Sequence, residues 1–318
     1  MIRSVLSVLV TASLLLASSV TGTRTETNGG ALQKPSASNS AEPRSESTRT
    51  DSRLAILFMS ETRANLVPCS CPDGPWGGLA RRVGYLADRK SAIGSPVISL
   101  DGGGFLPVGT VPLRNDPNAE TGLIRLLAES LLRSNLDVIT LDPGDESYLR
   151  QIVPDLWPRI EARAIDASIP SPTRVVSWNG KPVAILALHE SLDDEAVIAA
   201  AQAARAEAEV LIVLARADGV SGRRIAALTR ADLVVFSFGV RTERPVRYEG
   251  CWIVGAGREG KEVGELYLTF DQGEIRIEDY SLTPMDDAIT PHAATETLVR
   301  TLLDEFGPGW RMLVTPVE

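Results

Sequence analysis

Short apolar runs, each of a length suited to one strand, recur along this chain and alternate with helical patterns. The first run covers residues 54–59, and similar runs follow at 96–100, 136–141, 183–188, 210–214, 232–236 and 252–254. A continuous apolar run of this length predicts a strand that is buried on both faces. Between the runs, apolar residues recur at helical spacing, for example at Leu79, Val83 and Leu86. The alternation predicts an α/β fold.

The end of the chain departs from this alternation. Residues 266–270 and 274–280 flank Asp271-Gln272-Gly273, a turn sequence that predicts an antiparallel hairpin. Further helices are expected at 123–131, 192–208 and 296–306.

The N-terminal part differs in composition from the rest. A basic start, an apolar run at 5–16 and small residues at 17–19 predict a signal peptide over residues 1–20. An uncleaved anchor is the alternative, although the run is shorter than the roughly 20 residues needed to span a membrane. Residues 21–52, rich in Ser, Thr and Glu, predict a disordered linker. We therefore expect an exported protein, periplasmic or extracellular, with one domain at 53–318 and no transmembrane segment after signal removal.

Charge and histidine content argue against several classes of function. The net charge of −9 argues against a nucleic-acid partner, because the phosphates would be repelled. His189 and His292 are the only histidines of the chain. Two histidines cannot supply a histidine-rich metal centre.

Polar residues and glycines gather directly after the predicted strands. Glu61 and Arg63 follow the first run, residues 101–104 (Asp-Gly-Gly-Gly) the second, residues 142–145 (Asp-Pro-Gly-Asp) the third, and Arg216 a later one. Ligand sites of α/β proteins gather at the carboxyl ends of parallel strands. We therefore expect these residues to line one cleft.

Three segments carry a resemblance to a known family. They are Asn65-Leu66-Val67-Pro68 after the first strand, Gly77-Gly78-Leu79-Ala80-Arg81-Arg82 at a helix start, and the glycine-bounded turn at 257–264. Together with the strand ends they resemble the N-terminal domain of bacterial 5′-nucleotidases, in the calcineurin-like metallophosphoesterase superfamily, over residues 54–282. The resemblance implies a four-layer α/β/β/α sandwich that ends in an antiparallel hairpin. It also implies two metal ions that activate a water for attack on phosphate.

The positions that the resemblance assigns to metal ligands carry other residues here. Glu61-Thr62-Arg63 stands for Asp-x-His, Gly103-Gly104 for Gly-Asp, residues 142–145 for Gly-Asn-His-Glu, and Arg216 for a histidine. Arginine is a permanent cation without an acceptor, so it cannot bind a metal ion. Its repulsion costs roughly 4 kcal/mol per unit charge pair at about 4 Å and an effective dielectric of about 20. We expect no working two-metal site, and a cleft lined by Glu61, Arg63, Asp101, Gly104, Asp145 and Arg216.

Cys69, Cys71 and Cys251 are the three cysteines. Free thiols tend not to persist in an oxidising compartment, so we expect a disulfide between Cys251 and either Cys69 or Cys71. One alternative is a site in which all three sulfurs bind one Zn or Cu ion, and another is a redox-active Cys69/Cys71 pair. Pro68-Cys69-Ser70-Cys71 is similar to a motif of a bacterial subgroup of the same superfamily, sometimes fused to multihaem cytochrome c domains. This chain has no Cys-x-x-Cys-His haem motif.

These observations leave three hypotheses on function. We favour an exported, non-catalytic binding or scaffold protein on a degenerate metallophosphoesterase fold, which needs no cofactor. Its partner would be a protein or a small anion, the anion held by Arg63 and Arg216. The second hypothesis is a phosphohydrolase with a single-metal site rebuilt from Glu61, Asp101 and Asp145. The third is a thiol-based metal or redox protein that uses the three cysteines.

Overall fold

The computed structural model describes residues 53–306, apart from 73, 95, 107–116, 170–172 and 272. The described residues lie within one unit, Ser45–Glu318. The expected signal peptide (1–20), the expected linker (21–52) and the end of the expected domain (307–318) lie outside the described residues. No helix in the described ranges is both long and apolar enough to cross a membrane.

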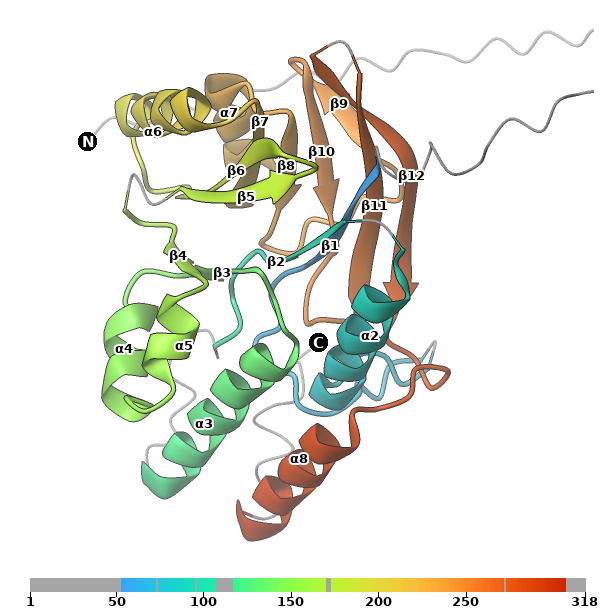
Figure 1. Cartoon of the computed structure of the whole chain (residues 1–318). Coiled ribbons are helices and arrows are strands. Elements are labelled where there is room, and N and C mark those ends of the chain that lie inside the picture. Colours follow the sequence, from blue (N-terminus) through green and yellow to red (C-terminus); the bar gives the residue numbers. More distant parts are fainter. Residues whose placement is uncertain are drawn as a thin grey trace, which may run out of the picture. The chain divides into compact units, whose positions relative to one another are not determined.

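Two six-stranded sheets form the middle of the fold (Figure 1). The first has the order β12-β11-β1-β2-β3-β4 and contains β1 (Arg53–Met59), β2 (Val97–Asp101), β3 (Val138–Leu141), β4 (Ala164–Asp166), β11 (Glu262–Asp271) and β12 (Glu274–Pro284). The second has the order β5-β6-β7-β8-β10-β9 and contains β5 (Arg174–Trp178), β6 (Lys181–His189), β7 (Val210–Arg216), β8 (Leu233–Phe236), β9 (Val246–Tyr248) and β10 (Cys251–Gly255).

Most neighbouring strands run parallel. In the first sheet β1 to β4 are parallel, and in the second β6, β7, β8 and β10 are parallel. The carboxyl ends of these strands therefore share one edge within each sheet. Strand β11 pairs antiparallel with both β1 and β12, and β5 and β9 pair antiparallel at the edges of the second sheet.

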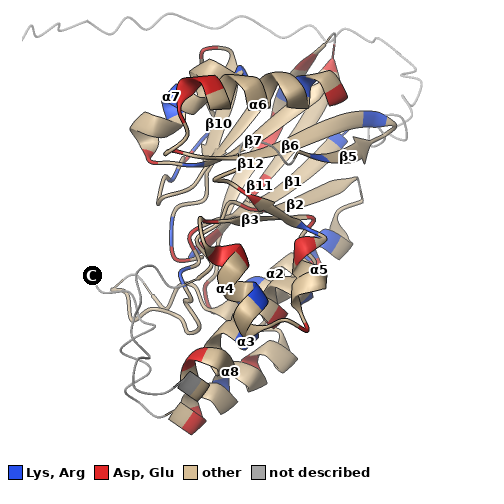
Figure 2. Ribbon diagram, turned by 90° about the vertical axis from the view of Figure 1, so that its left-hand side faces the viewer, with Lys and Arg blue, Asp and Glu red and all other residues tan. Residues whose placement is uncertain are grey.

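The helices of the described part pack on the outer sides of the sheets (Figures 1 and 2). The first sheet is covered by α2 (Leu79–Ala92), α3 (Pro117–Arg133), α4 (Asp145–Ile152), α5 (Trp157–Glu161) and α8 (Ala293–Phe306). The second is covered by α6 (Asp194–Glu207) and α7 (Gly219–Thr229).

The alternation of side chains along β1 shows how the layers are held together. Leu54, Ile56 and Phe58 belong to an apolar cluster shared with β6, β7, β8 and β10 of the other sheet. Leu57 and Met59 point the opposite way, into the cluster formed with the helices of the first sheet. Successive residues of a strand face opposite sides, so a continuous apolar strand is what two buried faces require.

The predicted α/β class is confirmed, and each apolar run forms a strand. Strand β7 continues two residues beyond the predicted run, so that Arg216 is its last residue. The sequence analysis did not predict β4, β5, β9, α4, α5 or α7. Strand β5 lies at a sheet edge and alternates between half-buried and exposed residues up to the buried Trp178, so it lacks the continuous apolar signal.

Candidate functional site

The candidate site lies at the carboxyl ends of the parallel strands. Glu61 follows β1, Asp101 ends β2, Asp142 follows β3, Arg216 ends β7 and Ser237 follows β8. We call Glu61, Arg63, Asp101, Asp142, Asp145, Arg216 and Ser237 the strand-end cluster. It joins residues from both sheets, since Arg216 and Ser237 belong to the second and the others to the first.

Arg216 is the centre of this cluster and is only 2% exposed. Its Nε donates to Asp142 Oδ1, and its Nη2 donates to Asp142 Oδ2 at 2.6 Å. Its Nη1 donates to Glu61 Oε1 and, at 3.2 Å, to Ser237 Oγ. The guanidinium also lies 4.2 Å from the centre of the Phe238 ring. All three guanidinium nitrogens therefore have partners inside the protein.

Glu61 holds two cations with one carboxylate. Its side chain is fully buried, and its Oε2 accepts a hydrogen bond from Arg63 Nε at 2.5 Å. Its other oxygen, Oε1, accepts from Arg216. The backbone of Glu61 has a φ of 54°, and its N–H donates to the carbonyl of Gly103 at 2.8 Å. This left-handed conformation, unusual for a residue with a side chain, is held by the loop after β2. Arg63 is more open to solvent, with 38% of its side chain exposed.

Gly103 and Gly104 leave the space that this ion pairing needs. Their φ values are 93° and 72°, which favour glycine. A Cβ at Gly103 would lie 2.7 Å from Arg216 Cδ, and a Cβ at Gly104 would lie 2.6 Å from Glu61 Oε1. Both distances are below van der Waals contact. The glycine pair and the buried Arg216–Glu61 pair are therefore parts of one arrangement.

Asp101 and Asp145 are carboxylates of a different kind. Asp101 is fully buried, its Oδ1 accepts from the Gly103 N–H at 2.8 Å, and its Oδ2 has no hydrogen-bond partner among the described residues. Asp145 opens α4, and its Oδ2 accepts from the Asp142 N–H at 2.9 Å. Burial raises the pKa of each to about 7, because a charged carboxylate loses hydration. Either carboxyl therefore changes its charge near neutral pH.

Arg82 is a second buried arginine that the sequence analysis did not single out. It lies on α2 at 1% exposure and donates to the carbonyls of Asn65 and Glu259 at 3.3 and 3.4 Å. Burial lowers its pKa to about 10, while the charge of Asp101 acts in the opposite direction. The pair Arg81-Arg82 in the helix-start motif was the one sequence signal for a buried arginine, but only the fold shows that Arg82 is the buried one.

The predicted cleft residues are brought to one edge, with one correction. We expected Arg63 and Arg216 to hold a small anion, but Arg216 is wrong for that role. Its nitrogens are engaged by Asp142, Glu61 and Ser237, and the two carboxylates would repel an anion there. Asp142 and Ser237 were missed as partners. Asp142 gave one signal, its place directly after a strand.

The cysteines are paired differently from the prediction. Cys69 and Cys71 are joined by a disulfide, and Cys251 is a buried free thiol. The expected bridge to Cys251 is therefore wrong. The Cys251 Sγ lies 3.3 Å from the Ala226 carbonyl of α7, in the apolar cluster of the second sheet. Cys69, by contrast, lies in the loop after β1 of the first sheet. The structure does not bring the three sulfurs together.

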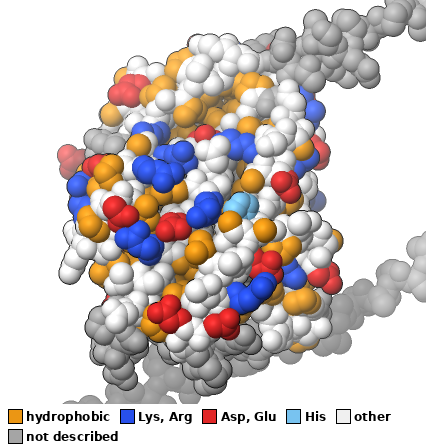
Figure 3. All heavy atoms as spheres, turned by 60° about the horizontal axis from the view of Figure 1, so that its bottom comes forward, with side chains coloured by type: hydrophobic (Ala, Val, Ile, Leu, Met, Phe, Trp, Pro, Cys, Tyr) orange, Lys and Arg blue, Asp and Glu red, His pale blue; other side chains and the backbone are white. Residues whose placement is uncertain are grey.

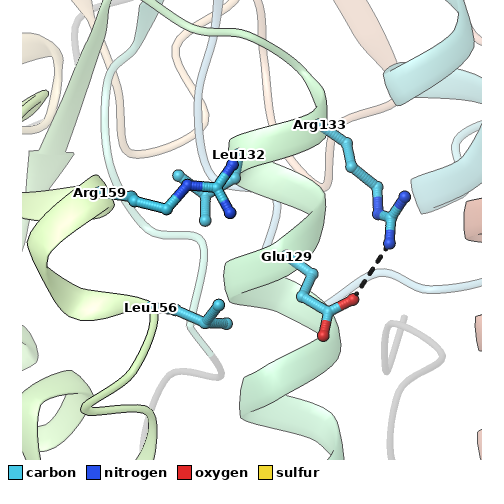
Figure 4. Close-up of a pocket in the computed structure, with 5 residues that line it drawn as sticks. All are labelled: Glu129, Leu132, Arg133, Leu156 and Arg159. Atoms are coloured by element: carbon cyan, nitrogen blue, oxygen red, sulfur yellow. Dashed lines mark hydrogen bonds and ion pairs between the residues drawn. The ribbon is translucent and has the colours of Figure 1, made fainter.

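Cavities of the described part also lie outside the strand-end cluster, and among them are the following two. One of about 380 Å³ lies between the end of α3 and the start of α5, lined by Glu129, Leu132, Arg133, Leu156 and Arg159 (Figure 4). Another of about 270 Å³ is lined by residues of α2, α8 and the segment before Cys69, including Pro68 and Arg81. On the face of Figure 3, basic, acidic and apolar side chains are interspersed. Neither cavity brings together the residues expected to line the cleft.

Comparisons with known proteins identify the fold. No protein-family profile matches the chain, and no curated protein sequence matches it. The sulfate thiohydrolase SoxB of Thermus thermophilus matches with a TM-score of 0.63 and 16% identity, over 79% of this chain and 60% of that one. A 5′-nucleotidase precursor from the same species gives 0.62 and 20%, over 80% and 59%. The calcineurin-like phosphoesterase YfkN of Bacillus subtilis gives 0.53 and 15%, over 80% and 97%.

These likenesses show that the chain has the fold of the N-terminal domain of 5′-nucleotidases and calcineurin-like phosphoesterases. The chain spans about three fifths of the length of the first two structures. At these identities the likeness concerns the fold alone.

The residues at the strand ends do not fit the two metal ions that this fold family implies. Arg63 and Arg216 place cations where ligands are needed, and Gly104 has no side chain. The Glu61 carboxylate is held between two guanidinium groups. Among the described residues, no group of three His, Cys, Asp or Glu side chains is placed to hold a metal ion.

Proposed function

We propose that this protein is an exported, non-catalytic binding or scaffold protein, in which a buried ion-pair network replaces the two-metal centre of the fold. The observation that carries the proposal is Arg216, whose guanidinium is bonded to Glu61, Asp142 and Ser237 at the strand ends. A positive side chain in this position does electrostatically what a cation would do for the same carboxylates. Export rests on the apolar run at 5–16 that follows a basic start.

The energetics favour keeping this arrangement over binding a metal. A dication about 4 Å from one guanidinium would be repelled by roughly 8 kcal/mol at an effective dielectric of about 20. Moving Arg216 aside would instead take a buried guanidinium away from its partners Glu61, Asp142 and Ser237. Removing one member of a buried pair typically costs about 3–5 kcal/mol. Both routes to a metal-bound state are therefore costly.

The partner is expected to be a protein or a small anion. The anion alternative now depends on Arg63 alone, because Arg63 keeps 38% of its side chain exposed while Arg216 is engaged. Arg63 already donates to Glu61, so an anion would have to compete with a buried carboxylate. A protein partner that uses the exposed surface needs no such competition.

Metal analysis combined with a phosphatase assay tests the proposal. The protein is purified from an exporting host without chelators, and p-nitrophenyl phosphate and a nucleoside monophosphate are offered with added Mn²⁺ or Zn²⁺. We expect neither a stoichiometric metal nor metal-dependent turnover. A bound metal with turnover that Glu61→Gln abolishes would overturn the proposal in favour of a rebuilt phosphohydrolase.

Calorimetric titration with inorganic phosphate separates the two partner classes. Binding that is lost in Arg63→Gln but kept in Arg258→Gln, another exposed arginine, would assign an anion ligand. We expect no phosphate binding at the strand ends, which leaves the protein partner.

A further inference from the structure

The Cys69–Cys71 disulfide lies in the loop between β1 and α2, outside the strand-end cluster. We infer that this disulfide is a thiol–disulfide exchange site, which accepts two electrons from a thiol reductant. The inference does not rest on the proposed function, because none of its residues belongs to the Arg216 network.

The disulfide contributes little to holding the chain together. It joins residues that are two positions apart, and on the chain-entropy model the stabilisation by a disulfide grows with the length of the loop it closes. The loop is already held by backbone hydrogen bonds. The Cys69 N–H donates to the Trp76 carbonyl at 2.8 Å, and the Gly74 N–H donates to the Cys71 carbonyl at 3.1 Å. A structural role therefore does not explain the bond.

Further contacts fix the loop to its surroundings without using the sulfurs. The Gly77 N–H donates to the Met285 carbonyl at 2.9 Å, in the segment after β12. Arg81 of α2 donates to the Pro75 carbonyl of the loop and, at 3.2 Å, to the Met285 carbonyl. The loop can therefore keep its position when the disulfide opens.

The two cysteine residues differ in their access to solvent. Cys69 is 5% exposed, whereas Cys71 is half-buried and lies between Ser70 and Pro72, which are both exposed. An attacking thiolate therefore reaches Cys71 first. Cys69 becomes the leaving group.

The exchange balances in two steps. A thiolate of the reductant attacks Cys71 Sγ, a new S–S bond forms there, and the Cys69–Cys71 bond breaks with its electron pair on Cys69 Sγ. A second thiolate then attacks the reductant's sulfur in this mixed disulfide and releases Cys71 as a thiolate. The reductant leaves as a disulfide, the two cysteines gain two electrons, and their thiolates take protons from solvent.

Cys251 provides an internal control because it has the opposite surroundings. It is fully buried, and burial raises the pKa of its thiol. A buried, protonated thiol is a poor nucleophile. The third cysteine is therefore expected to take no part in the exchange while the protein is folded.

The experiment uses the oxidised full chain and two reductants, glutathione and a reduced Cys-x-x-Cys dithiol protein. After timed exposure, free thiols are alkylated and counted by mass, and the circular dichroism melt of the reduced protein is recorded. We expect two thiols to appear, at Cys69 and Cys71, while the melt stays cooperative and Cys251 stays unlabelled. If exchange is faster with the protein dithiol, the reductant is assigned as a protein. If exchange is at least as fast with glutathione, the reductant is assigned as a small thiol. If the pair resists both reductants in the folded protein, or reduction abolishes the melt, the inference is wrong.

Single variants test the order of attack. Cys69→Ser leaves the half-buried Cys71, and Cys71→Ser leaves the buried Cys69. We expect Cys69→Ser to form a mixed disulfide with oxidised glutathione at least tenfold faster than Cys71→Ser. The oxidised wild type, whose free thiol is the buried Cys251, is the control. Equal rates would overturn the assignment of Cys71 as the attacked sulfur.

Discussion

The strand-end cluster and the loop that carries Cys69 and Cys71 both contain reactive side chains, but they present them in opposite ways. In the cluster, Arg216 and Glu61 are at most 2% exposed and are bonded to each other. In the loop, Cys71 is half-buried between two exposed residues, and the backbone is held without the sulfurs. Whether a reactive side chain can meet an outside partner therefore depends on its burial and its internal partners more than on its residue type. The cluster uses its charges internally, whereas the loop leaves its bond free to react.

Arg216→Met is expected to give the largest loss, because it removes the cation from the centre of the cluster. Glu61 would remain fully buried with only Arg63, and Asp142 would lose its bidentate partner. We expect the free energy of unfolding to fall by about 3–5 kcal/mol, measured by urea denaturation at neutral pH. Arg63→Met is the matched control on the same carboxylate. Since Arg63 is partly exposed, it should cost no more than about 1 kcal/mol. Equal losses in the two variants would contradict this prediction, because exposure of the arginine to solvent would then have no effect on stability.

Gly104→Ala tests whether the glycine pair and the ion pair are one unit. The new Cβ would lie 2.6 Å from Glu61 Oε1, and the residue would keep a φ of 72°. Gly144→Ala is the control, since Gly144 has a φ of 89° and nothing within 4 Å of its Cβ position. Both variants carry about 1 kcal/mol or more of backbone strain, and only Gly104→Ala adds overpacking of about 1–3 kcal/mol. If the two variants lose the same free energy of unfolding, the strand-end cluster can rearrange to accommodate the new side chain, and the prediction is wrong.

Asp101 gives the cluster a pH dependence with a definite sign. Its pKa is raised to about 7 in the folded chain, whereas an unfolded Asp titrates near about 4. Between these values the folded state binds more protons, so the stability contributed by this group falls as pH rises and then stays constant above the folded pKa.

Asp101→Asn should therefore be more stable than the wild type at about pH 8, by up to roughly 4 kcal/mol. The gain should shrink towards zero as the pH is lowered to about 4. The amide oxygen can still accept from the Gly103 N–H. Asp155→Asn is the control, because Arg125 lowers the pKa of exposed Asp155, and its effect should have the opposite sign. A gain for Asp101→Asn that does not vary with pH would contradict the raised pKa as its cause.

How much of this could be predicted from the sequence depends on the range of the interactions involved. Strands β1 and β7 were predictable because burial on two faces makes them continuously apolar. Strand β5, at an edge, and β4, only three residues long, lack that signal. The gathering of Glu61 and Asp101 was predictable because β1 and β2 are parallel neighbours of one sheet and end at a shared edge.

Pairing was not predictable, because it depends on loop conformation and on contacts between sheets. Glu61, Arg63 and Ala64 all have positive φ values, and none of them is a glycine, the residue type that would have predicted this conformation. Arg216 reaches Asp142 across from the other sheet. The cysteines show the same limit. Their number and the expected compartment favoured a disulfide, but only the fold places Cys251 under α7.

Cys69→Ser/Cys71→Ser is expected to give the smallest loss and therefore measures the loop against the cluster. On the chain-entropy model, a disulfide that closes about three residues stabilises by about 1.5 kcal/mol, whereas one closing about 180 residues would give about 5 kcal/mol. The double variant should thus lose about 1.5 kcal/mol or less in urea denaturation, well below the loss in Arg216→Met. The reduced wild type is the control and should match the variant. If the free energy of unfolding fell by about 5 kcal/mol, the disulfide would be a structural bond, and the loop would not differ from the strand-end cluster in this respect. A small loss would mean that the bond can open while the fold stays intact, as an exchange site requires.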